Sequence, residues 1–155
     1  MALKIAINGF GRIGRCVTRL ISSRNDVEIV AINDMASIEM MLYLLQNDSV
    51  HGPFDEEVSI VNANHLKIGS KTISIFSQKD PTQLNFGACG ADVVLECSGL
   101  FLTANATRHH LEKGVKKVII SAPKQDNETP TFVLGVNHHL YAGEAIISYA
   151  SCTTN

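Results

Sequence analysis

A glycine-rich turn between an apolar run and an amphipathic segment constrains the fold of this 155-residue chain most strongly. The turn is a G-x-G-x-x-G motif at residues 9–14, and it follows the apolar run 3–8. Apolar residues then recur at helical spacing through 12–24, and a second β-branched run covers 26–33. The order is strand, turn, helix and strand, which makes the two strands parallel, adjacent and right-handed in their connection.

The remainder of the chain continues this alternation. Ser37 is placed to cap a helix that continues to Leu45, and Asp80-Pro81 is typical of a helix start. Apolar and polar residues alternate around 58–76, which predicts small antiparallel strands. A second series comprises a strand at 92–96, a helix at 103–113, a strand at 117–121, and short strands at 131–136 and 145–148. We therefore predict an α/β fold with a doubly wound, mostly parallel, Rossmann-type sheet in one domain over 1–155.

Composition excludes several classes of function. With 45% hydrophobic and 18% charged residues, the chain can bury a core as an ordinary globular domain. The 13 Lys and Arg against 15 Asp and Glu give a net charge of −2, which offers no basic surface for nucleic acid or an anionic membrane. No run approaches the roughly 18 apolar residues of a membrane helix, and no signal peptide is evident. We expect a cytoplasmic protein.

The cysteines do not predict a metal site. Cys16, Cys89, Cys97 and Cys152 lie far apart, without C-x-x-C spacing and without clustered histidines. This arrangement argues against a zinc site and against the disulfide framework of a secreted protein. We expect reduced thiols and no bound metal.

The context of the glycine-rich turn predicts a dinucleotide-binding site. The motif alone fits equally well a tight loop without a ligand. A dinucleotide site requires in addition a preceding strand, a following helix and an acidic residue about 20 positions further on, at the end of the second strand. Asp34 follows Gly14 by 20 residues and comes directly after the second strand, so all three conditions are met.

Each residue of this motif has a separate physical role. Gly9 permits the sharp turn, Gly11 lets a pyrophosphate approach the backbone, and Gly14 lets the helix pack closely on the strand. The helix start offers free N–H groups and a positive dipole to the phosphates. Arg12 either adds charge there or is a solvated surface side chain. Asp34 can accept hydrogen bonds from ribose hydroxyls and would repel a 2′-phosphate, which favours NAD over NADP.

A candidate nucleophile lies near the end of the chain. Cys152 follows an apolar strand and is flanked by residue types that start helices, namely Ser151, Thr153, Thr154 and Asn155. A cysteine at a helix N-terminus has a lowered pKa and is more nucleophilic at neutral pH. A lone cysteine is more often an inert small hydrophobe, so these residues alone leave both interpretations open.

Taken together, five segments closely resemble phosphorylating glyceraldehyde-3-phosphate dehydrogenase. They are residues 8–15, 33–34, 48–52, 98–101 and the specific run Ser-Cys-Thr-Thr-Asn at 151–155. The resemblance covers the whole chain and corresponds to the N-terminal, NAD-binding half of the family. It implies that the family's second, catalytic domain lies outside these residues.

The resemblance also implies roles for individual residues toward NAD. Arg12 and Ile13 would lie against the pyrophosphate through their backbone, and Asp34 would hold the adenosine ribose. Ser121 would lie near the nicotinamide ribose. Lys79 occupies a position near the adenine where the family usually has arginine, and the contact there is largely through the main chain.

The same resemblance implies a covalent mechanism. A Cys152 thiolate would add to the aldehyde of glyceraldehyde 3-phosphate, with Ser151 and Thr153 binding substrate or inorganic phosphate. After hydride transfer to NAD, phosphate would cleave the thioester and release 1,3-bisphosphoglycerate. The family's proton acceptor is a histidine beyond Asn155. His51 belongs to a structural motif, and the other histidines are interpreted as surface residues, namely His65, His109, His110, His138 and His139.

Our leading expectation is thus an NAD-dependent glycolytic oxidoreductase that is a homotetramer at full length. Erythrose-4-phosphate dehydrogenase is an alternative, although that relative tends to have Glu at the position of Asp34 and a different sequence at 121–123. A second alternative is a non-catalytic dinucleotide-binding module, and the 155 residues alone are expected to bind NAD without turnover. A redox-sensing repressor would need a DNA-binding motif, which the sequence lacks.

Overall fold

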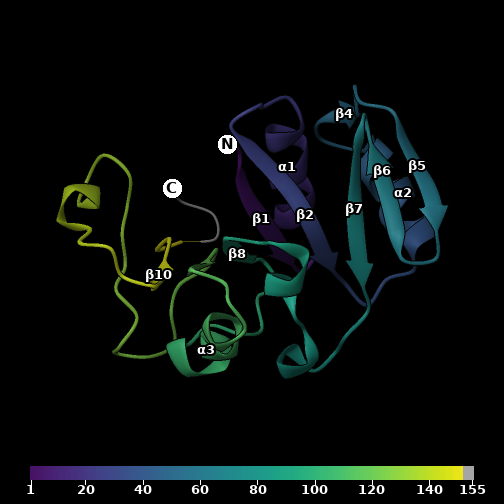
Figure 1. Cartoon of the computed structure of the whole chain (residues 1–155). Coiled ribbons are helices and arrows are strands. Elements are labelled where there is room, and N and C mark those ends of the chain that lie inside the picture. Colours follow the sequence, from purple (N-terminus) through teal and green to yellow (C-terminus); the bar gives the residue numbers. More distant parts are fainter. Residues whose placement is uncertain (152–155) are drawn as a thin grey trace.

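A single large sheet organises the chain in a computed structural model that describes residues 1–151 (Figure 1). Its strands are β1 (Leu3–Asn8), β2 (Val27–Asn33), β5 (Val58–Asn62), β6 (His65–Ile68), β7 (Lys71–Phe76), β8 (Val93–Glu96), β9 (Lys117–Ile120) and β10 (Ile146–Ser148). A separate small hairpin is formed by β3 (Asn47–Asp48) and β4 (Gly52–Pro53). The helices are α1 (Arg12–Ser22), α2 (Ile38–Gln46) and α3 (Ala104–Glu112), with short 3-10 turns η1 (Pro81–Gln83), η2 (Phe86–Cys89) and η3 (His138–Leu140).

The sheet has the order β10-β9-β8-β1-β2-β7-β6-β5. All neighbours from β10 to β7 are parallel, whereas β6 and β5 are antiparallel to their neighbours. This confirms the predicted doubly wound α/β sheet with an antiparallel excursion at 58–76. The excursion extends the same sheet, because β7 pairs with β2. The strand order reverses at β1, and ligands of such sheets bind at this switch point.

Two hydrophobic cores lie on opposite faces of the sheet. Residues alternate between the faces along each strand, so Ile5 and Ile7 of β1 enter one core and Ala6 enters the other. Helices α1 and α2 cover the first core, since Val17, Ile21, Met41 and Leu45 pack there. The second core is covered by α3 and the 3-10 turns, which contribute Leu84, Phe86 and Leu111.

Side-chain caps fix where the helices begin. The Ser37 hydroxyl accepts the N–H of Met40 at 3.3 Å, and the Thr103 hydroxyl accepts the N–H of Ala106 at 3.1 Å. Both helix starts are as predicted. Asp80 also accepts an N–H two residues on, at 3.0 Å, but only a single 3-10 turn follows it.

One predicted strand, at 131–136, is wrong. Only a single bridge forms there, between Thr131 and Ser148, before the chain turns. The Asn137 side chain closes this turn, because it accepts the Val133 N–H at 2.7 Å and donates to the Thr131 carbonyl at 2.9 Å. Gly135 has φ +86°, outside the strand region. Local side-chain hydrogen bonds thus outcompete a strand ladder here.

The expectation that His110 is a surface residue is also wrong. His110 is fully buried on the inner side of α3, together with Ala104 and Thr107 at helical spacing. Its ring stacks on Phe86 at a centroid distance of 5.5 Å. Neither ring nitrogen has a hydrogen-bond partner, so burial lowers the pKa of His110 to about 3.

Two further observations apply to residues 1–151. None of their helices combines the length and the apolarity that crossing a membrane requires. Nor do their His, Cys, Asp and Glu side chains gather in groups of three or more that could hold a metal ion.

At the free edge of the sheet, β5 carries a bulge, because its register with β6 shifts between Ile60 and Asn62.

Candidate functional site

The glycine-rich turn connects β1 to α1, and two of its glycines lie very close to neighbouring backbone atoms. Gly9 has φ +96°, and a Cβ there would lie 2.5 Å from the Ser98 nitrogen. A Cβ at Gly14 would lie 2.2 Å from the Gly9 carbonyl oxygen. Gly11, by contrast, has open space where its Cβ would be, with no atom within 4 Å. Two glycines therefore allow the turn to pack, and the third leaves the backbone accessible to a ligand.

A cavity of about 250 Å³ opens at the switch point, over the carboxyl ends of β1, β2 and β8. Four predicted residues line it, namely Gly9, Gly11, Asp34 and Lys79. Polar side chains that were not predicted as site residues line it as well, among them Asn8, Asn33, Gln78 and Ser98. The structure thus brings Gly9, Gly11 and Asp34 together in one hollow.

The Asp34 carboxylate ties the end of β2 to the glycine-rich turn. One of its oxygens accepts the Phe10 N–H at 2.6 Å, and the other accepts the Ala36 N–H at 2.9 Å. The Gly9 N–H also donates to the Asn33 carbonyl at 2.8 Å. Each carboxylate oxygen keeps a second lone pair, which can accept a ribose hydroxyl at the rim of the cavity.

The first turn of α1 can accept an anion. Its N-cap is Gly11, which offers no side-chain hydrogen bond, and the first turn contains no acidic residue. Arg12 and Ile13 are exposed there. The first N–H groups of a helix are unpaired and carry a partial positive charge, so this end of α1 suits a phosphate.

Other predicted residues line a second hollow of about 460 Å³, between α1 and the ends of β8 and β9. Ile13, Ser121 and Ser151 lie there. Cys97 borders both hollows and forms part of the wall between them. Arg12 and Gly14 line neither. Cys152 and Thr153 lie outside the described residues, so their roles stay predictions.

Cys97 is not a nucleophile in this arrangement. Burial raises the pKa of its thiol to about 11, and this outweighs the hydrogen bond from Ser121. The thiol is therefore protonated at neutral pH, as is usual for a cysteine buried in apolar surroundings.

A buried polar network beneath the cavity was not predicted. Asn8, Asn33 and Glu96 are each at most 5% exposed. The Asn8 amide donates to Glu96 at 2.6 Å, and the Asn33 amide donates to Asn8 at 2.8 Å. Burial raises the pKa of Glu96. A signal was present, because three apolar strands each end on a polar residue and the carboxyl ends of parallel strands share one edge.

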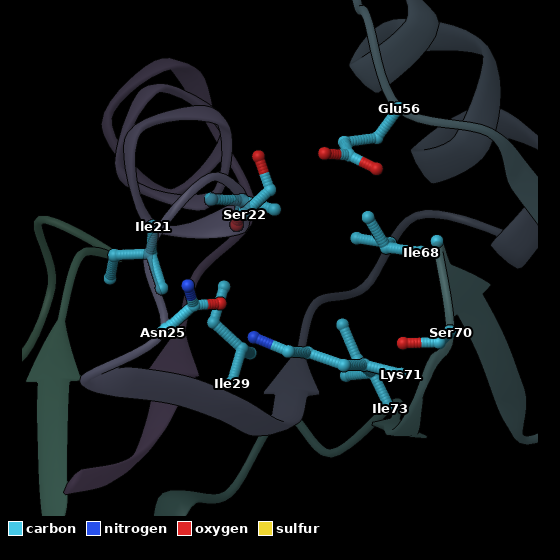
Figure 2. Close-up of a pocket in the computed structure, with 11 residues that line it drawn as sticks. Ile21, Ser22, Asn25, Ile29, Glu56, Ile68, Ser70, Lys71 and Ile73 are labelled. Carbon is cyan, nitrogen blue, oxygen red and sulfur yellow. The ribbon is translucent and has the colours of Figure 1, made fainter. Parts of the chain in front are cut away.

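A third cavity, of about 200 Å³, lies at the opposite, amino end of the sheet, between the last turns of α1 and the turn joining β6 to β7 (Figure 2). Ile21, Ile29, Ile68 and Ile73 form the apolar part of its lining, and the rest is mainly polar, with Ser22, Asn25, Glu56 and Ser70 among the lining residues. The Lys71 ammonium donates to the Arg24 carbonyl at 3.4 Å. No predicted site residue lies in this cavity.

Comparison with known proteins shows the family to which this chain belongs. The family profile described as "Glyceraldehyde 3-phosphate dehydrogenase, NAD binding domain" matches residues 3–104. The chain belongs to this family. The matched range contains the glycine-rich turn, Asp34 and the network of Asn8, Asn33 and Glu96. The cofactor of this glyceraldehyde-3-phosphate dehydrogenase domain is NAD, as its motif predicts.

Individual relatives extend the similarity over all 155 residues. The glyceraldehyde-3-phosphate dehydrogenase of Haemophilus influenzae is 50% identical, and the chain covers 45% of it. The cytosolic glyceraldehyde-3-phosphate dehydrogenase of Trypanosoma brucei brucei and glyceraldehyde-3-phosphate dehydrogenase A of Escherichia coli K12 are each 48% identical, with 46% covered. The chain therefore spans about half the length of the curated relatives it matches.

Proposed function

We propose that this chain is the NAD-binding part of a glycolytic glyceraldehyde-3-phosphate dehydrogenase. The reaction converts glyceraldehyde 3-phosphate, inorganic phosphate and NAD to 1,3-bisphosphoglycerate and NADH. The observation that carries the proposal is the open backbone at Gly11 beside the Asp34 carboxylate, at the switch point of a sheet whose sequence belongs to this family. Gly11 leaves room for a pyrophosphate, and Asp34 leaves acceptors for a ribose, so the residues fit the cofactor.

The residues of this chain hold the cofactor at four points. The backbone of 11–13 faces the pyrophosphate, and the Asp34 carboxylate holds the adenosine ribose. The Lys79 main chain lies near the adenine, and Ser121 lies near the nicotinamide ribose. When bound, NAD supplies the hydride acceptor.

Cys152 is the proposed nucleophile. Its thiolate adds to the aldehyde carbon, which then loses hydride and becomes a thioester. Ser151 and Thr153 hold the substrate or the attacking phosphate through hydroxyl and N–H groups. Cleavage by phosphate rather than by water retains the energy of oxidation in an acyl phosphate. The histidine that accepts the proton in this family is not among these residues.

The setting of the enzyme follows from its relatives and its composition. A cytosolic relative supports a cytoplasmic location, and the near-neutral charge supports the absence of nucleic-acid and membrane partners. We assign residues 1–155 to one NAD-binding domain, which works with a second, catalytic domain. The full-length protein is a homotetramer in this proposal.

Calorimetric titration of the 155-residue chain with NAD and NADP tests the cofactor site. We expect NAD to bind and NADP to bind about tenfold more weakly or worse, because the Asp34 carboxylate would face the 2′-phosphate. The variant Asp55→Asn, at an exposed carboxylate outside the site, should leave both affinities unchanged. Equal affinities for NAD and NADP would contradict the assignment of Asp34.

Kinetics test the reaction. We expect the full-length protein to prefer glyceraldehyde 3-phosphate to erythrose 4-phosphate in kcat/KM, and Cys152→Ser to abolish turnover while NAD still binds. Preference for the four-carbon sugar would support the alternative dehydrogenase. The 155 residues alone should bind NAD without producing NADH at steady state, and NADH production by the purified chain would refute this.

A further inference from the structure

The Glu96 carboxylate, at the end of β8, is almost completely buried and accepts hydrogen bonds from two neighbouring segments. The residue is 1% exposed. One oxygen accepts the Asn8 side-chain amide at 2.6 Å, and the other accepts the Ser98 N–H at 2.8 Å. Both oxygens therefore face donors, and both donors belong to residues that line the switch-point cavity.

The hydrogen bonds continue from Glu96 across the floor of the cavity. The Asn8 side-chain oxygen accepts the Asn33 amide at 2.8 Å. Asn33 then pairs with the backbone of Gln78 in both directions, at 3.0 Å to its carbonyl and 2.8 Å from its N–H. One continuous network thus connects the ends of β8, β1 and β2 to the segment that follows β7.

No cation within residues 1–151 forms an ion pair with this carboxylate. The ion pairs among the described residues are Arg24–Asp26, Arg108–Glu128 and Lys116–Asp92, none of which includes Glu96. Burying an unpaired carboxylate is costly, and the backbone ladder already pairs β1 with β8. Strand pairing alone therefore does not account for the burial of this carboxylate.

The glycine-rich turn packs directly on the group that Glu96 holds. A Cβ at Gly9 would lie 2.5 Å from the Ser98 nitrogen and 2.6 Å from the Ser98 Cα. Any shift of the Ser98 backbone toward the turn would collide with Gly9, and any shift away would leave a gap beneath the turn. The hydrogen bond from Ser98 to Glu96 thereby sets the position of the turn.

We propose that Glu96 is a positioning residue for NAD. Its carboxylate holds Ser98 against the glycine-rich turn and, through Asn8 and Asn33, aligns the other segments that border the dinucleotide. This inference rests on the proposed NAD site and adds a residue that does not itself touch the cofactor. The charge of Glu96 is needed because both of its oxygens must act as acceptors.

The single variant Glu96→Gln tests this role. Its amide nitrogen would face the Asn8 amide nitrogen or the Ser98 N–H, so one hydrogen bond is lost with little change in shape. We expect the affinity for NAD to fall about tenfold, which corresponds to one such bond. NADH affinity should fall by the same factor, because the aligned segments border the part of the dinucleotide that both forms share.

A polarity swap distinguishes positioning from a general loss of packing. In the double variant Asn8→Asp with Glu96→Gln, the new amide donates to the new carboxylate and still accepts the Ser98 N–H. The new carboxylate also accepts the Asn33 amide, so every hydrogen bond and the net charge are restored. Asn8→Asp alone places two carboxylates together. We expect each single variant to bind NAD weakly and the double variant to regain most of the affinity.

Calorimetry with NAD and NADH and amide hydrogen exchange at Ser98 provide the readouts. Exchange should be faster in Glu96→Gln and slow again in the double variant, with or without cofactor. Glu57→Gln, at an exposed glutamate, is the matched control and should change neither the affinities for NAD and NADH nor the exchange rate at Ser98. If wild type fails to bind NAD, the proposed function fails. If wild type binds and folded Glu96→Gln binds equally well, or if the swap does not rescue, the positioning role is overturned.

Discussion

The two halves of the sheet differ in the burial of their titratable groups. On the β1-β2-β7 side, the core is hydrophobic, and two hydrogen-bonded carboxylates with lowered pKa values lie outside it, namely the exposed Asp26 and the half-buried Asp48. On the β8-β9-β10 side, burial displaces the pKa values of Glu96, Cys97 and His110. The first half therefore places its glycine-rich turn above an apolar core, and the second half carries buried titratable groups whose pKa values are displaced.

The segments that connect successive strands also differ between the two halves of the sheet. In the first half, β1 passes to β2 through α1, and the chain leaves β2 through α2. In the second half, β9 passes to β10 through residues 121–145, which contain no α-helix. Turns closed by side chains take the place of a regular crossover there.

A substitution at Gly14 should destabilise the first half of the sheet more than any other change proposed below. Gly→Ala inside a helix ordinarily stabilises by up to about 1 kcal/mol, but here the new Cβ would meet the Gly9 carbonyl. We expect Gly14→Ala to lower the free energy of unfolding by about 4 kcal/mol, as measured by urea denaturation.

The matched variant is Gly11→Ala, whose Cβ meets nothing within 4 Å. It should lower the free energy of unfolding by no more than about 1 kcal/mol, because alanine is a poorer N-cap than glycine. It should also weaken NAD binding, because the Cβ would lie where we propose that the pyrophosphate approaches. An unchanged midpoint for Gly14→Ala would show that α1 can move away from β1 without cost.

Acid should destabilise the second half through His110. An unfolded histidine titrates near pH 6.5, whereas burial holds the folded pKa at about 3. Between these values the unfolded chain binds a proton that the folded chain does not. Stability is therefore complete above pH 6.5 and falls as the pH drops toward 3, by up to about 1.4 kcal/mol per pH unit.

Urea unfolding at pH 7, 6, 5 and 4 measures this slope. His110→Phe keeps the stack on Phe86 and should make the slope shallower, while His139→Phe, at an exposed histidine, should keep it. Glu96 acts in the opposite direction, since its folded pKa is raised, so the difference between wild type and His110→Phe isolates the histidine. Equal slopes would refute the assignment.

Arg19, in the first half of the sheet, is a cation whose hydrogen-bond partners are mainly backbone carbonyls. Its replacement should lower the free energy of unfolding less than Gly14→Ala does. Its guanidinium donates to the Leu45 carbonyl at 2.6 Å and the Gly52 carbonyl at 2.9 Å, and lies 5.2 Å from the Phe54 ring centre. We expect Arg19→Met to cost about 2 kcal/mol in urea unfolding. Arg24→Met, which removes an exposed ion pair, should not shift the midpoint detectably. Equal effects of the two variants would contradict this distinction.

Sequence patterns predicted the first half closely because each signal there is local. The apolar run 3–8 coincides with β1, and the predicted helix 12–24 ends two residues early, at Ser22, where the chain turns. The roles of Gly9 and Gly14 followed from the spacing of the motif, and the close contacts agree with them. Membership of the family supports NAD as the ligand.

The second half was harder to predict because its decisive contacts are between residues far apart in the chain. Glu96 and Asn8 are 88 residues apart, so no periodicity relates them. His110 occupies an inward position of α3, but helical spacing alone does not distinguish a buried histidine from a surface one. The run at 131–136 is β-branched in part, yet Asn137 supplies a turn that its composition did not reveal.

The bulge between Ile60 and Asn62 has a consequence for association between molecules. Strand β5 is the last strand on its side of the sheet, and Ile60 and Val61 are exposed on it. A foreign strand that pairs with this edge needs a regular row of backbone donors and acceptors, and an extra residue interrupts that row. The edge is thereby a poor template for aggregation, even though two of its side chains are apolar.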